Sequence, residues 1–411
     1  MDKSTAQLTD DPRDGISRRE LLKGAAALAV ASAAAHQLPA WAKQKSTVLA
    51  YVGTYTPNGQ GIHLLSIDMS TGDLTQVKVA AAVPSPSWLA FHPNKAFLYA
   101  VNEISNYNGS PSGSVTSFAV NASTGDLTLL NVVSSQGAGP AHLSVDPLGQ
   151  FVFVANYGGG SFAVLPIQSD GSLGNATDVH VDVGAVGPVH ATNAPPGSFA
   201  ISGHDAPHAH MIQSDPAGKF VFGVDLGQDR IYGWLLNRAT GTLTPNSPPF
   251  VALPPGDGPR HFAFHPNGRW FYSLQEEAST LVFFSYDATS GVLTPQQMVA
   301  TLPQEFVGTN FTSEVMVSTN GKFVYAANRL HDSVGIFAVD SGTGELTQVG
   351  DEWTRGDYPR NFNIDPTGSF LYVCDQRSDS IAAYAVSAHK LDFTGQYTAM
   401  GSPACIVFLS V

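Results

Sequence analysis

Residues 139–156 read GPAHLSVDPLGQFVFVAN: an apolar segment, a turn of the type Asp-Pro-x-Gly, and a second apolar segment that closes on an amide. Pro presets the backbone of such a turn and Gly tolerates a positive φ, so the stretch predicts a β-hairpin. The pattern recurs along the chain. The second residues of the six turns are Pro93, Pro147, Pro216, Pro266, Thr319 and Pro366.

Successive turns are separated by 54, 69, 50, 53 and 47 residues. This period is typical of the four-stranded blades of a β-propeller. A second hairpin mark, in which Gly is followed two residues later by Leu, falls once in each period. Its glycines are Gly72, Gly125, Gly171, Gly241, Gly291 and Gly344. Each repeat is therefore predicted to contain an inner and an outer hairpin.

The two ends of the chain supply the parts of a further repeat. Residues 48–55 match the second strand of a repeat that has no first strand before it, and residues 402–409 resemble a first strand, after which the chain stops. We therefore predict an all-β, seven-bladed β-propeller of four-stranded blades, in which the C-terminal strand completes the N-terminal blade. Such closure leaves no open sheet edge around the ring.

The N-terminal segment has the order of a twin-arginine signal peptide. Residues 17–23 read SRRELLK, an apolar run follows at 24–35, and residues 40–42 fit a small-residue cleavage site. The run is too short to cross a bilayer, which needs about 20 residues. We expect residues 1–42 to be this signal peptide, residues 43–411 to be the propeller, and the mature protein to be periplasmic or secreted, without a membrane segment. A retained amphipathic anchor is the alternative.

The composition excludes some partners and favours others. A net charge of −13 disfavours nucleic acid, because both surfaces are negative. Charged residues make up 13% of the chain, while 40 Gly and 27 Pro are spread throughout it, which suits many short strands and turns. Cys374 and Cys405 both lie in strand-like apolar runs, so we expect buried thiols rather than a bridge. We expect a monomer.

In each hairpin, the start of the first strand and the end of the second meet at one rim. The ninth residue after the second turn residue is an amide or acid in all six repeats: Asn102, Asn156, Asp225, Gln275, Asn328 and Asp375. A feature that all blades share is expected to bond backbone groups. The tenth residue differs, as a binding site requires: Glu103, Tyr157, Leu226, Glu276, Arg329 and Gln376.

The starts of the first strands add further charged and titratable residues to this rim. Together the rim could hold His142, His208, His210, Arg260, His261, Glu276, Glu314, Arg329 and Arg360. Three arginines at one channel mouth predict an anionic ligand, because the guanidinium fork matches a carboxylate or phosphate. The alternative is a structural ring of ion pairs between these arginines and glutamates.

The dense pair His208 and His210 could bind a metal or move protons. No third ligand is evident at a diagnostic spacing, so we predict neither a metal nor a cofactor. Histidine titrates near neutrality and a carboxylate can remove a proton, so the pair and Glu276 are the candidate acid–base groups. No Gly-x-Ser-x-Gly turn supports a nucleophilic serine.

Several motifs resemble those of the propeller lactonases, a family similar to bacterial 6-phosphogluconolactonase and to fungal carboxymuconate lactonizing enzyme. They are GPAH at 139–142, VANYGGGS at 154–161, PHAH at 207–210, DLGQD at 225–229, GPRH at 258–261, ANRLHDS at 327–333 and PR at 359–360. The resemblance runs over residues 48–409. It implies that one of His208 and His210 acts with Glu276, while Arg260 and Arg329 hold the anionic groups of the substrate.

One departure concerns the substrate. The family often has Arg-Gln just before the position of Pro207, whereas this chain has His204 and Asp205, which argues against a phosphorylated lactone. The insertion at 184–206 leads directly into the histidine pair and is expected to be a rim loop over the site.

The expected function is an exported lactonase that hydrolyses a small anionic lactone-type substrate. Glu276 or a histidine would activate water, and an arginine would stabilise the oxyanion. The expected substrate-binding residues are Arg260, Arg329, Arg360, His142 and Glu314. Two alternatives remain: a muconate-type lactonizing enzyme, which would use the same residues as a lyase or isomerase, and a non-catalytic periplasmic binding or scaffold propeller.

Overall fold

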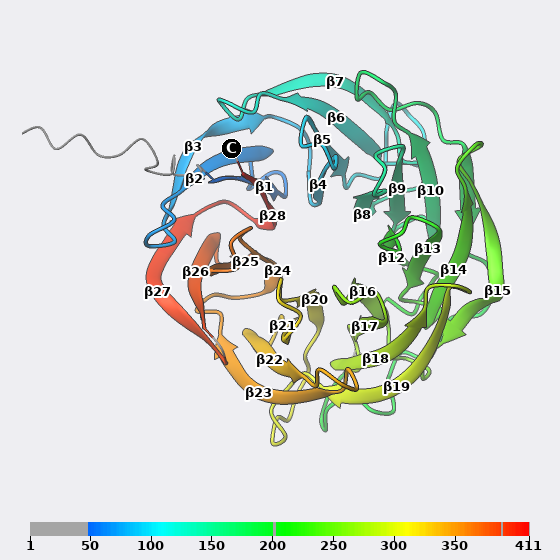
Figure 1. The fold of residues 1–411 in the computed structure, drawn as a ribbon, viewed down its shortest axis with the longest axis vertical. Coiled ribbons are helices and arrows are strands. Elements are labelled where there is room, and N and C mark those ends of the chain that lie inside the picture. The colour runs from blue at the N-terminus through cyan, green and yellow to red at the C-terminus, as the bar shows by residue number, and fades with distance from the viewer. Residues whose placement is uncertain (1–47, 200–202, 388, 411) are drawn as a thin grey trace, which may run out of the picture. The chain divides into compact units, whose positions relative to one another are not determined.

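The computed structural model describes residues 48–199, 203–387 and 389–410. Within these ranges, the regular structure consists of β-strands that form seven four-stranded antiparallel sheets. The sheets are arranged as blades in a ring (Figure 1). The predicted seven-bladed propeller is thereby confirmed. The predicted signal peptide, residues 1–42, lies outside the described residues.

We number the blades in chain order and give the strands of each from the channel outward. Blade 1 consists of β28 (Pro403–Ser410), β1 (Val48–Thr54), β2 (Ile62–Ile67) and β3 (Leu74–Ala81), and blade 2 of β4 (Leu89–Phe91), β5 (Phe97–Asn102), β6 (Ser114–Val120) and β7 (Leu127–Ser134). Blade 3 consists of β8 (Pro140–Val145), β9 (Phe151–Asn156), β10 (Ser161–Pro166) and β11 (Asp178–Val181), and blade 4 of β12 (Ala209–Ser214), β13 (Phe220–Asp225), β14 (Arg230–Asn237) and β15 (Thr242–Ala252). Blade 5 consists of β16 (Pro259–Phe264), β17 (Trp270–Gln275), β18 (Thr280–Asp287) and β19 (Val292–Ala300), and blade 6 of β20 (Thr312–Val317), β21 (Phe323–Asn328), β22 (Ser333–Val339) and β23 (Leu346–Trp353). Blade 7 consists of β24 (Pro359–Ile364), β25 (Phe370–Asp375), β26 (Ser380–Ser387) and β27 (Lys390–Ala399).

The Asp-Pro-x-Gly turns join the two innermost strands of their blades, as predicted. In the turn between β8 and β9, the Asp146 carboxylate accepts hydrogen bonds from the backbone N–H groups of Gln150 and Phe151. Gly149 adopts a φ of 69°, which a side chain would strain. Side chain and backbone together therefore fix the turn and the register of the inner hairpin.

Neighbouring blades pack through apolar faces, and tyrosines add a repeated hydrogen bond between them. The Tyr99 hydroxyl on β5 donates to the carbonyl of Gly171 in blade 3 at 3.1 Å. Tyr51 reaches Gly125 in blade 2, and Tyr272 reaches Gly344 in blade 6, at 2.8 and 2.9 Å. Each acceptor is the glycine of the outer hairpin in the next blade, so this mark of the repeat also joins neighbouring blades.

The ring closes by the pairing of β28 with β1, which brings the two ends of the propeller together (Figure 1). Val52 pairs with Ile406 and Val48 with Ser410 in an antiparallel ladder. The predicted completion of the N-terminal blade is confirmed. Cys374 and Cys405 are buried free thiols, as expected. No helix long and apolar enough to cross a membrane occurs in the described part of the chain.

The innermost strands of several blades carry a β-bulge near their start. In β16, Pro259 pairs with Gln275 and His261 with Leu274, so Arg260 is an extra residue without a partner. The same shift makes Ala141, His210 and Arg360 the extra residues of β8, β12 and β24. A bulge re-aims side chains next to it, and these bulges stand where the site residues were predicted.

Candidate active site

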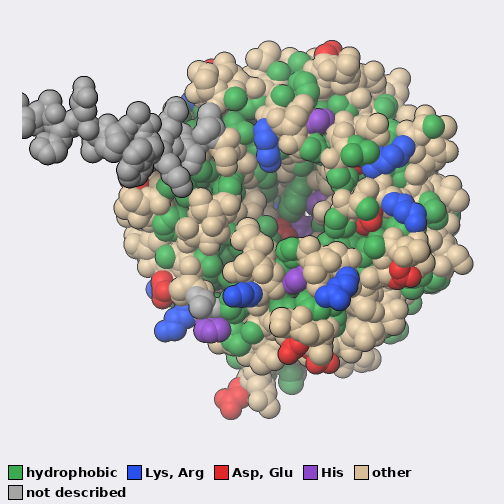
Figure 2. Space-filling model, in the orientation of Figure 1, with side chains coloured by type: hydrophobic (Ala, Val, Ile, Leu, Met, Phe, Trp, Pro, Cys, Tyr) green, Lys and Arg blue, Asp and Glu red, His purple; other side chains and the backbone are tan. Residues whose placement is uncertain are grey.

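One mouth of the channel contains a cavity of about 240 Å³, which we call the mouth cavity. It is lined by Glu103, Ala141, Tyr157, His210, Glu276, Arg329, Tyr358 and Arg360. Four of these occupy the tenth position of their repeat, where the blades differ, and three are bulged residues. Figure 2 shows the hollow at the centre of the ring.

Glu276 is held by two arginines from different blades. Its Oε1 lies 2.6 Å from Arg329 Nη2, and its Oε2 lies 2.9 Å from Arg260 Nε. Burial raises the pKa of Glu276, but the charges of Arg329 and Arg260 outweigh this effect and lower it. Burial and Arg329 lower the pKa of Arg260 to about 10. At neutral pH Glu276 and Arg260 are therefore charged.

The two arginines are also fixed by backbone carbonyls, which limits their movement. Arg329 Nη2 donates to the carbonyl of Thr312 at 2.9 Å, and Arg260 Nη1 donates to the carbonyl of Ser313. Both carbonyls belong to β20, the innermost strand of blade 6. The guanidinium groups are thus oriented before any substrate enters.

Arg360 and Glu103 form a second, looser pair across the cavity, with 3.7 Å between Nη2 and Oε2. Glu103 Oε2 also accepts a hydrogen bond of 2.6 Å from the Tyr55 hydroxyl, and the Arg360 guanidinium lies 5.0 Å from the centre of the Tyr55 ring. The ion pairs of the structural alternative are therefore present. The cavity lining carries two arginines and two glutamates, and Arg260 behind Glu276 adds an excess of one positive charge.

The two histidines of the dense pair take different positions. His210 lines the mouth cavity, and no hydrogen-bond partner for its Nδ1 is found in the described ranges. Burial and the charge of Arg260 hold the pKa of His210 well below its ordinary value, so its imidazole is neutral at neutral pH. The unpaired Nδ1 is itself a buried atom. A neutral imidazole can accept a proton at one ring nitrogen and donate a hydrogen bond from the other.

His208 lies outside the lining of the mouth cavity, behind Tyr157. Its Nδ1 is 2.9 Å from the Tyr157 carbonyl oxygen, its Nε2 is 2.9 Å from Asp205 Oδ1, and its ring stacks on the Tyr157 ring at 4.2 Å. Both ring nitrogens face oxygen acceptors. His208 is therefore placed to position Tyr157 rather than to touch a ligand in this cavity.

The structure places His142 and Glu314 elsewhere in the channel. They line a second cavity of about 530 Å³, which we call the channel cavity and which extends toward the Asp-Pro turns. His261 Nδ1 lies 3.1 Å from Glu314 Oε1. The mouth cavity thus brings together His210, Glu276, Arg329 and Arg360, with Arg260 behind Glu276. The substrate-binding role of His142 and Glu314 stays a prediction.

Sequence reasoning did not place Glu103, Tyr157, Tyr55 or Tyr358 among the site residues. Glu103 and Tyr157 occupy the variable tenth position, so the comparison between blades already contained their signal. Tyr358 stands in the loop before β24 with a φ of 67°, and its hydroxyl accepts from Arg329 Nη1 at 3.2 Å. Nothing in the repeat pattern of the sequence singles out this loop residue as a site residue.

Most of the ninth-position residues bond backbone groups, as expected. Asn102, Asn156 and Asn328 each donate from Nδ2 to a carbonyl oxygen of the segment that leads in from the preceding blade, those of Pro84, Ser135 and Thr301. The Asp225 carboxylate accepts from the N–H of His208 at 3.0 Å. It thereby orients the strand start that carries His210.

The insertion at 184–206 contacts the rim through residues near its end. His204 Nε2 lies 3.0 Å from Asp229 Oδ1, and Asp205 holds His208. Residues 200–202 fall outside the described ranges. No group of three or more His, Cys, Asp or Glu side chains suited to a metal ion is found among the residues described.

Comparison with known proteins places this geometry in a family. The family described as "Lactonase, 7-bladed beta-propeller" matches residues 49–408. The 6-phosphogluconolactonase of Bacillus subtilis is 33% identical over 368 residues, which cover 88% of this chain and 98% of that protein. The 6-phosphogluconolactonase of Pectobacterium carotovorum is 31% identical and covers 82% of this chain and 91% of its own length.

Among solved structures, the periplasmic gluconolactonase of Pseudomonas aeruginosa superposes with a TM-score of 0.81 at 30% identity. The match covers 89% of this chain and 100% of that protein. Fold, length and sequence thus agree over nearly the whole propeller. The chain belongs to the lactonase family of seven-bladed β-propellers.

Proposed function

We propose that this protein hydrolyses a small, non-phosphorylated sugar lactone in the mouth cavity. The observation that carries the proposal is the neutral imidazole of His210, which lines the same cavity as a carboxylate held by two buried arginines. Such an arrangement supplies a proton acceptor and fixed positive charge for an oxyanion. Membership of the lactonase family supports this reaction class.

In the proposed reaction, His210 accepts a proton from water while the water oxygen bonds to the lactone carbonyl carbon. The negative charge that develops on the carbonyl oxygen is stabilised by a guanidinium group of the mouth cavity. The bond between the carbonyl carbon and the ring oxygen then breaks, and the proton on His210 passes to that oxygen. The products are a hydroxy acid, which ionises to its carboxylate, and free enzyme.

Glu276 has a supporting role in this proposal. Two guanidinium groups at 2.6 and 2.9 Å stabilise its ionised form, which makes it a weak proton acceptor. Its carboxylate keeps Arg260 and Arg329 aligned at the cavity. The sequence left Glu276 and a histidine open as the base. We assign the role to His210, because both Glu276 oxygens are paired with arginines whereas the His210 ring is neutral and lines the cavity.

The charge balance of the site favours a substrate without phosphate. The excess of one positive charge matches one oxyanion or carboxylate, whereas a phosphate would add up to two further negative charges. Asp205, exposed beside His208, adds negative charge at the rim. A phosphorylated lactone remains the second candidate, because the relatives from Bacillus subtilis and Pectobacterium carotovorum are named 6-phosphogluconolactonase.

The proposed location is the periplasm or the exterior. The twin-arginine pattern at 17–23 supports export, and one structural relative is named a periplasmic gluconolactonase. The test is to replace Arg18 and Arg19 together by Lys and to assay the cell fractions. Retention of the variant in the cytoplasm is expected, whereas unchanged export would contradict a twin-arginine route.

The proposed activity is tested by proton release in a pH-stat. Purified protein receives gluconolactone, galactonolactone and 6-phosphogluconolactone in turn, the spontaneous rate is subtracted, and Glu276→Gln is run alongside. We expect turnover of a non-phosphorylated lactone and a loss of at least 100-fold in Glu276→Gln, because the two arginines lose their partner. Rates equal to the blank for all three lactones would contradict hydrolysis, and tight binding without turnover would favour the binding propeller.

A further inference from the structure

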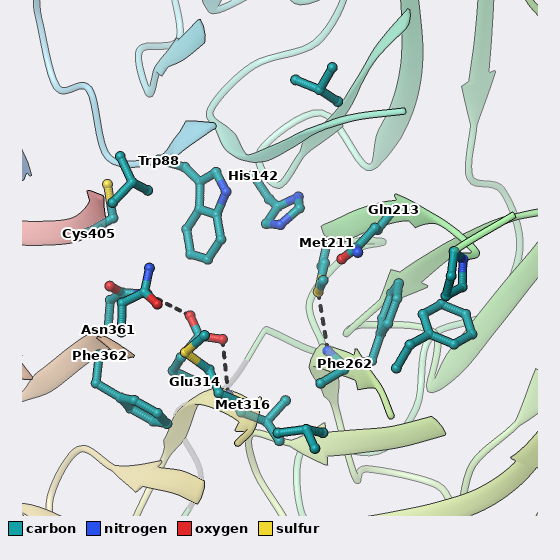
Figure 3. A pocket seen from close by; sticks show the side chains of 18 of the residues that line it. Trp88, His142, Met211, Gln213, Phe262, Glu314, Met316, Asn361, Phe362 and Cys405 are labelled. Carbon is teal, nitrogen blue, oxygen red and sulfur yellow. Dashed lines mark hydrogen bonds between the residues drawn. The ribbon is translucent and has the colours of Figure 1, made fainter. Parts of the chain in front are cut away.

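The channel cavity is larger than the mouth cavity and is built from different residues. Its volume of about 530 Å³ falls within the roughly 300–1,000 Å³ of small-molecule sites. It lies between the innermost strands of all seven blades, from Trp88 and His142 to Cys405, and includes the Asp-Pro turn of blade 4 (Figure 3). None of its lining residues lines the mouth cavity.

The wall of the channel cavity is mainly apolar. Its large apolar side chains include Trp88, Met211, Phe262, Met316, Phe362 and Ile406. Contact between water and such a wall is unfavourable, so a ligand with an apolar body would gain affinity there by displacing that water. Methionine side chains at two sides adapt to ligands of different outline.

Two acidic side chains, Asp215 and Glu314, are among the lining residues. The Asp215 carboxylate accepts hydrogen bonds from the N–H groups of Lys219 and Phe220 in its own turn and from the Tyr286 hydroxyl. Glu314 lies on β20, among the strands that surround the cavity. Its Oε1 accepts from His261 Nδ1 at 3.1 Å and from the Val315 N–H at 3.0 Å, and its Oε2 accepts from Asn361 Nδ2 at 2.7 Å. A carboxylate can accept about four hydrogen bonds, so one position on Oε2 stays open. In Figure 3 the carboxyl group lies between Asn361 and the space below Trp88.

The groups around Glu314 leave its charge largely unneutralised. Burial raises its pKa to about 7, although Arg260 acts in the opposite direction. Burial and Arg260 hold the pKa of His261 well below its ordinary value, and burial holds that of His142 low as well, so both rings are neutral. Cys405, whose pKa burial raises to about 12, stays a thiol. Arg260 is itself paired with Glu276.

We propose that the channel cavity is a second binding site for a small primary amine with an aromatic body. The ammonium group donates to the open position on Glu314 Oε2, and the ring lies against Trp88 and Phe262. The site is separate from lactone hydrolysis, and its existence does not depend on the proposed function.

Other ligand classes fit this cavity less well. An anion would be repelled by Glu314, and a neutral apolar molecule would leave the buried carboxylate without a counterion. A sugar-like molecule would place hydroxyl groups against the apolar wall. The net charge of −13 on the chain also favours the approach of cations over anions.

The test is calorimetric titration of the full chain with three probes of similar shape: 2-phenylethylamine, 2-phenylethanol and 3-phenylpropionate. At pH 8 we expect one amine to bind per chain, at least tenfold more tightly than the alcohol, and the acid not to bind. Because the ionised form of Glu314 is required and its pKa is about 7, the affinity for the amine should fall about tenfold between pH 8 and pH 6, whereas that for the alcohol should not change.

Two variants locate the binding. Glu314→Gln should remove the preference for the amine over the alcohol, and Gln213→Trp should fill the cavity and abolish binding of both. Gln296→Trp, on the exposed part of β19, is the matched control and should bind as the wild type does. Circular dichroism confirms that each variant is folded.

Three outcomes would overturn the proposal: no saturable binding of the amine to the wild type at millimolar concentration, equal affinity for the amine and the alcohol at pH 8, or full competition by gluconate. The last result would place the amine in the mouth cavity. The failure of lactone hydrolysis would be seen in the pH-stat instead, so the two proposals fail independently.

Discussion

At the mouth cavity, the same arginine charges act on Glu276 and His210 and favour the ionised carboxylate but the neutral imidazole. The guanidinium groups of Arg260 and Arg329 stabilise the carboxylate of Glu276, and the charge of Arg260 adds to burial in keeping His210 neutral. Pairs of titratable groups whose environments divide them in this way are typical of acid–base sites. We therefore propose that Glu276 serves in charge stabilisation and His210 in proton transfer.

Replacing the proposed base tests this assignment. We expect His210→Asn to lower kcat by about 10²–10⁴-fold, because water is no longer activated. The control is His180→Asn, since His180 lies on the outer strand β11. An unchanged kcat in His210→Asn would contradict the assignment and return the role of base to Glu276.

The pH dependence of the wild type provides an independent readout. His210 must be deprotonated to act as a base, and burial lowers its pKa in the folded protein. We therefore expect kcat/KM to stay level as the pH falls from 8 to 6.5 and to decline only below the lowered pKa of His210. A decline that begins near pH 7 would show that the essential base has an unperturbed or raised pKa.

The choice between lactones can be tested at Asp205. Its carboxylate is exposed and pairs with His208, whose ring stacks on Tyr157 of the mouth cavity. We expect Asp205→Asn to raise kcat/KM for 6-phosphogluconolactone relative to gluconolactone by about two- to tenfold, because a repulsive charge is removed. The ratio of the two initial rates measures this effect at low ionic strength, and 1 M salt should suppress it. A ratio that stays at the wild-type value would contradict repulsion by Asp205.

At the scale of strands, turns were easier to predict than bulges. The Asp-Pro-x-Gly turns follow from local chemistry, because the Asp side chain bonds to backbone groups within five residues of it. The bulges at His210, Arg260 and Arg360 depend instead on which residues of the partner strand they face. A regular hairpin was assumed from the sequence, so His142 and His210 were expected at one rim although they line different cavities.

The interblade tyrosines test how one blade stabilises the next. Tyr99→Phe removes the hydrogen bond to the buried carbonyl of Gly171 and keeps the ring, so we expect a loss of about 1–2 kcal/mol in the free energy of unfolding. Urea denaturation followed by tryptophan fluorescence measures the change. Tyr397→Phe, which removes the hydroxyl of a residue that is 52% exposed, should change stability little. Equal effects of the two substitutions would show that the Tyr99 hydroxyl contributes nothing specific.

At the scale of the whole molecule, closure depends on the pairing of strands from the two ends of the propeller. Removal of residues 403–411 leaves β1 with an exposed edge and uncovers part of the apolar cluster that contains Val48 and Ile406. We expect the shortened chain to aggregate or to unfold at a lower urea concentration, as measured by light scattering and fluorescence. A synthetic peptide of residues 402–410 should restore the midpoint in part. Wild-type stability of the shortened chain would contradict closure by β28.

The sequence by itself determined the number of blades, the closure of the ring and the positions at which the blades differ. These features follow from local turn chemistry, from the period of the repeat and from the alternation of apolar residues, and all three can be recognised in the amino-acid sequence. It also selected Glu276, Arg329 and His210, since a rim position is set by its distance from a turn.

Only the tertiary structure decided how these residues divide the channel. Arg260 and Arg329 meet at one carboxylate, His208 lies behind Tyr157, and Glu314 faces an apolar cavity. These relations join residues from different blades. They depend on bulges, burial and the summed field of charges that are distant in sequence, so no local pattern could specify them.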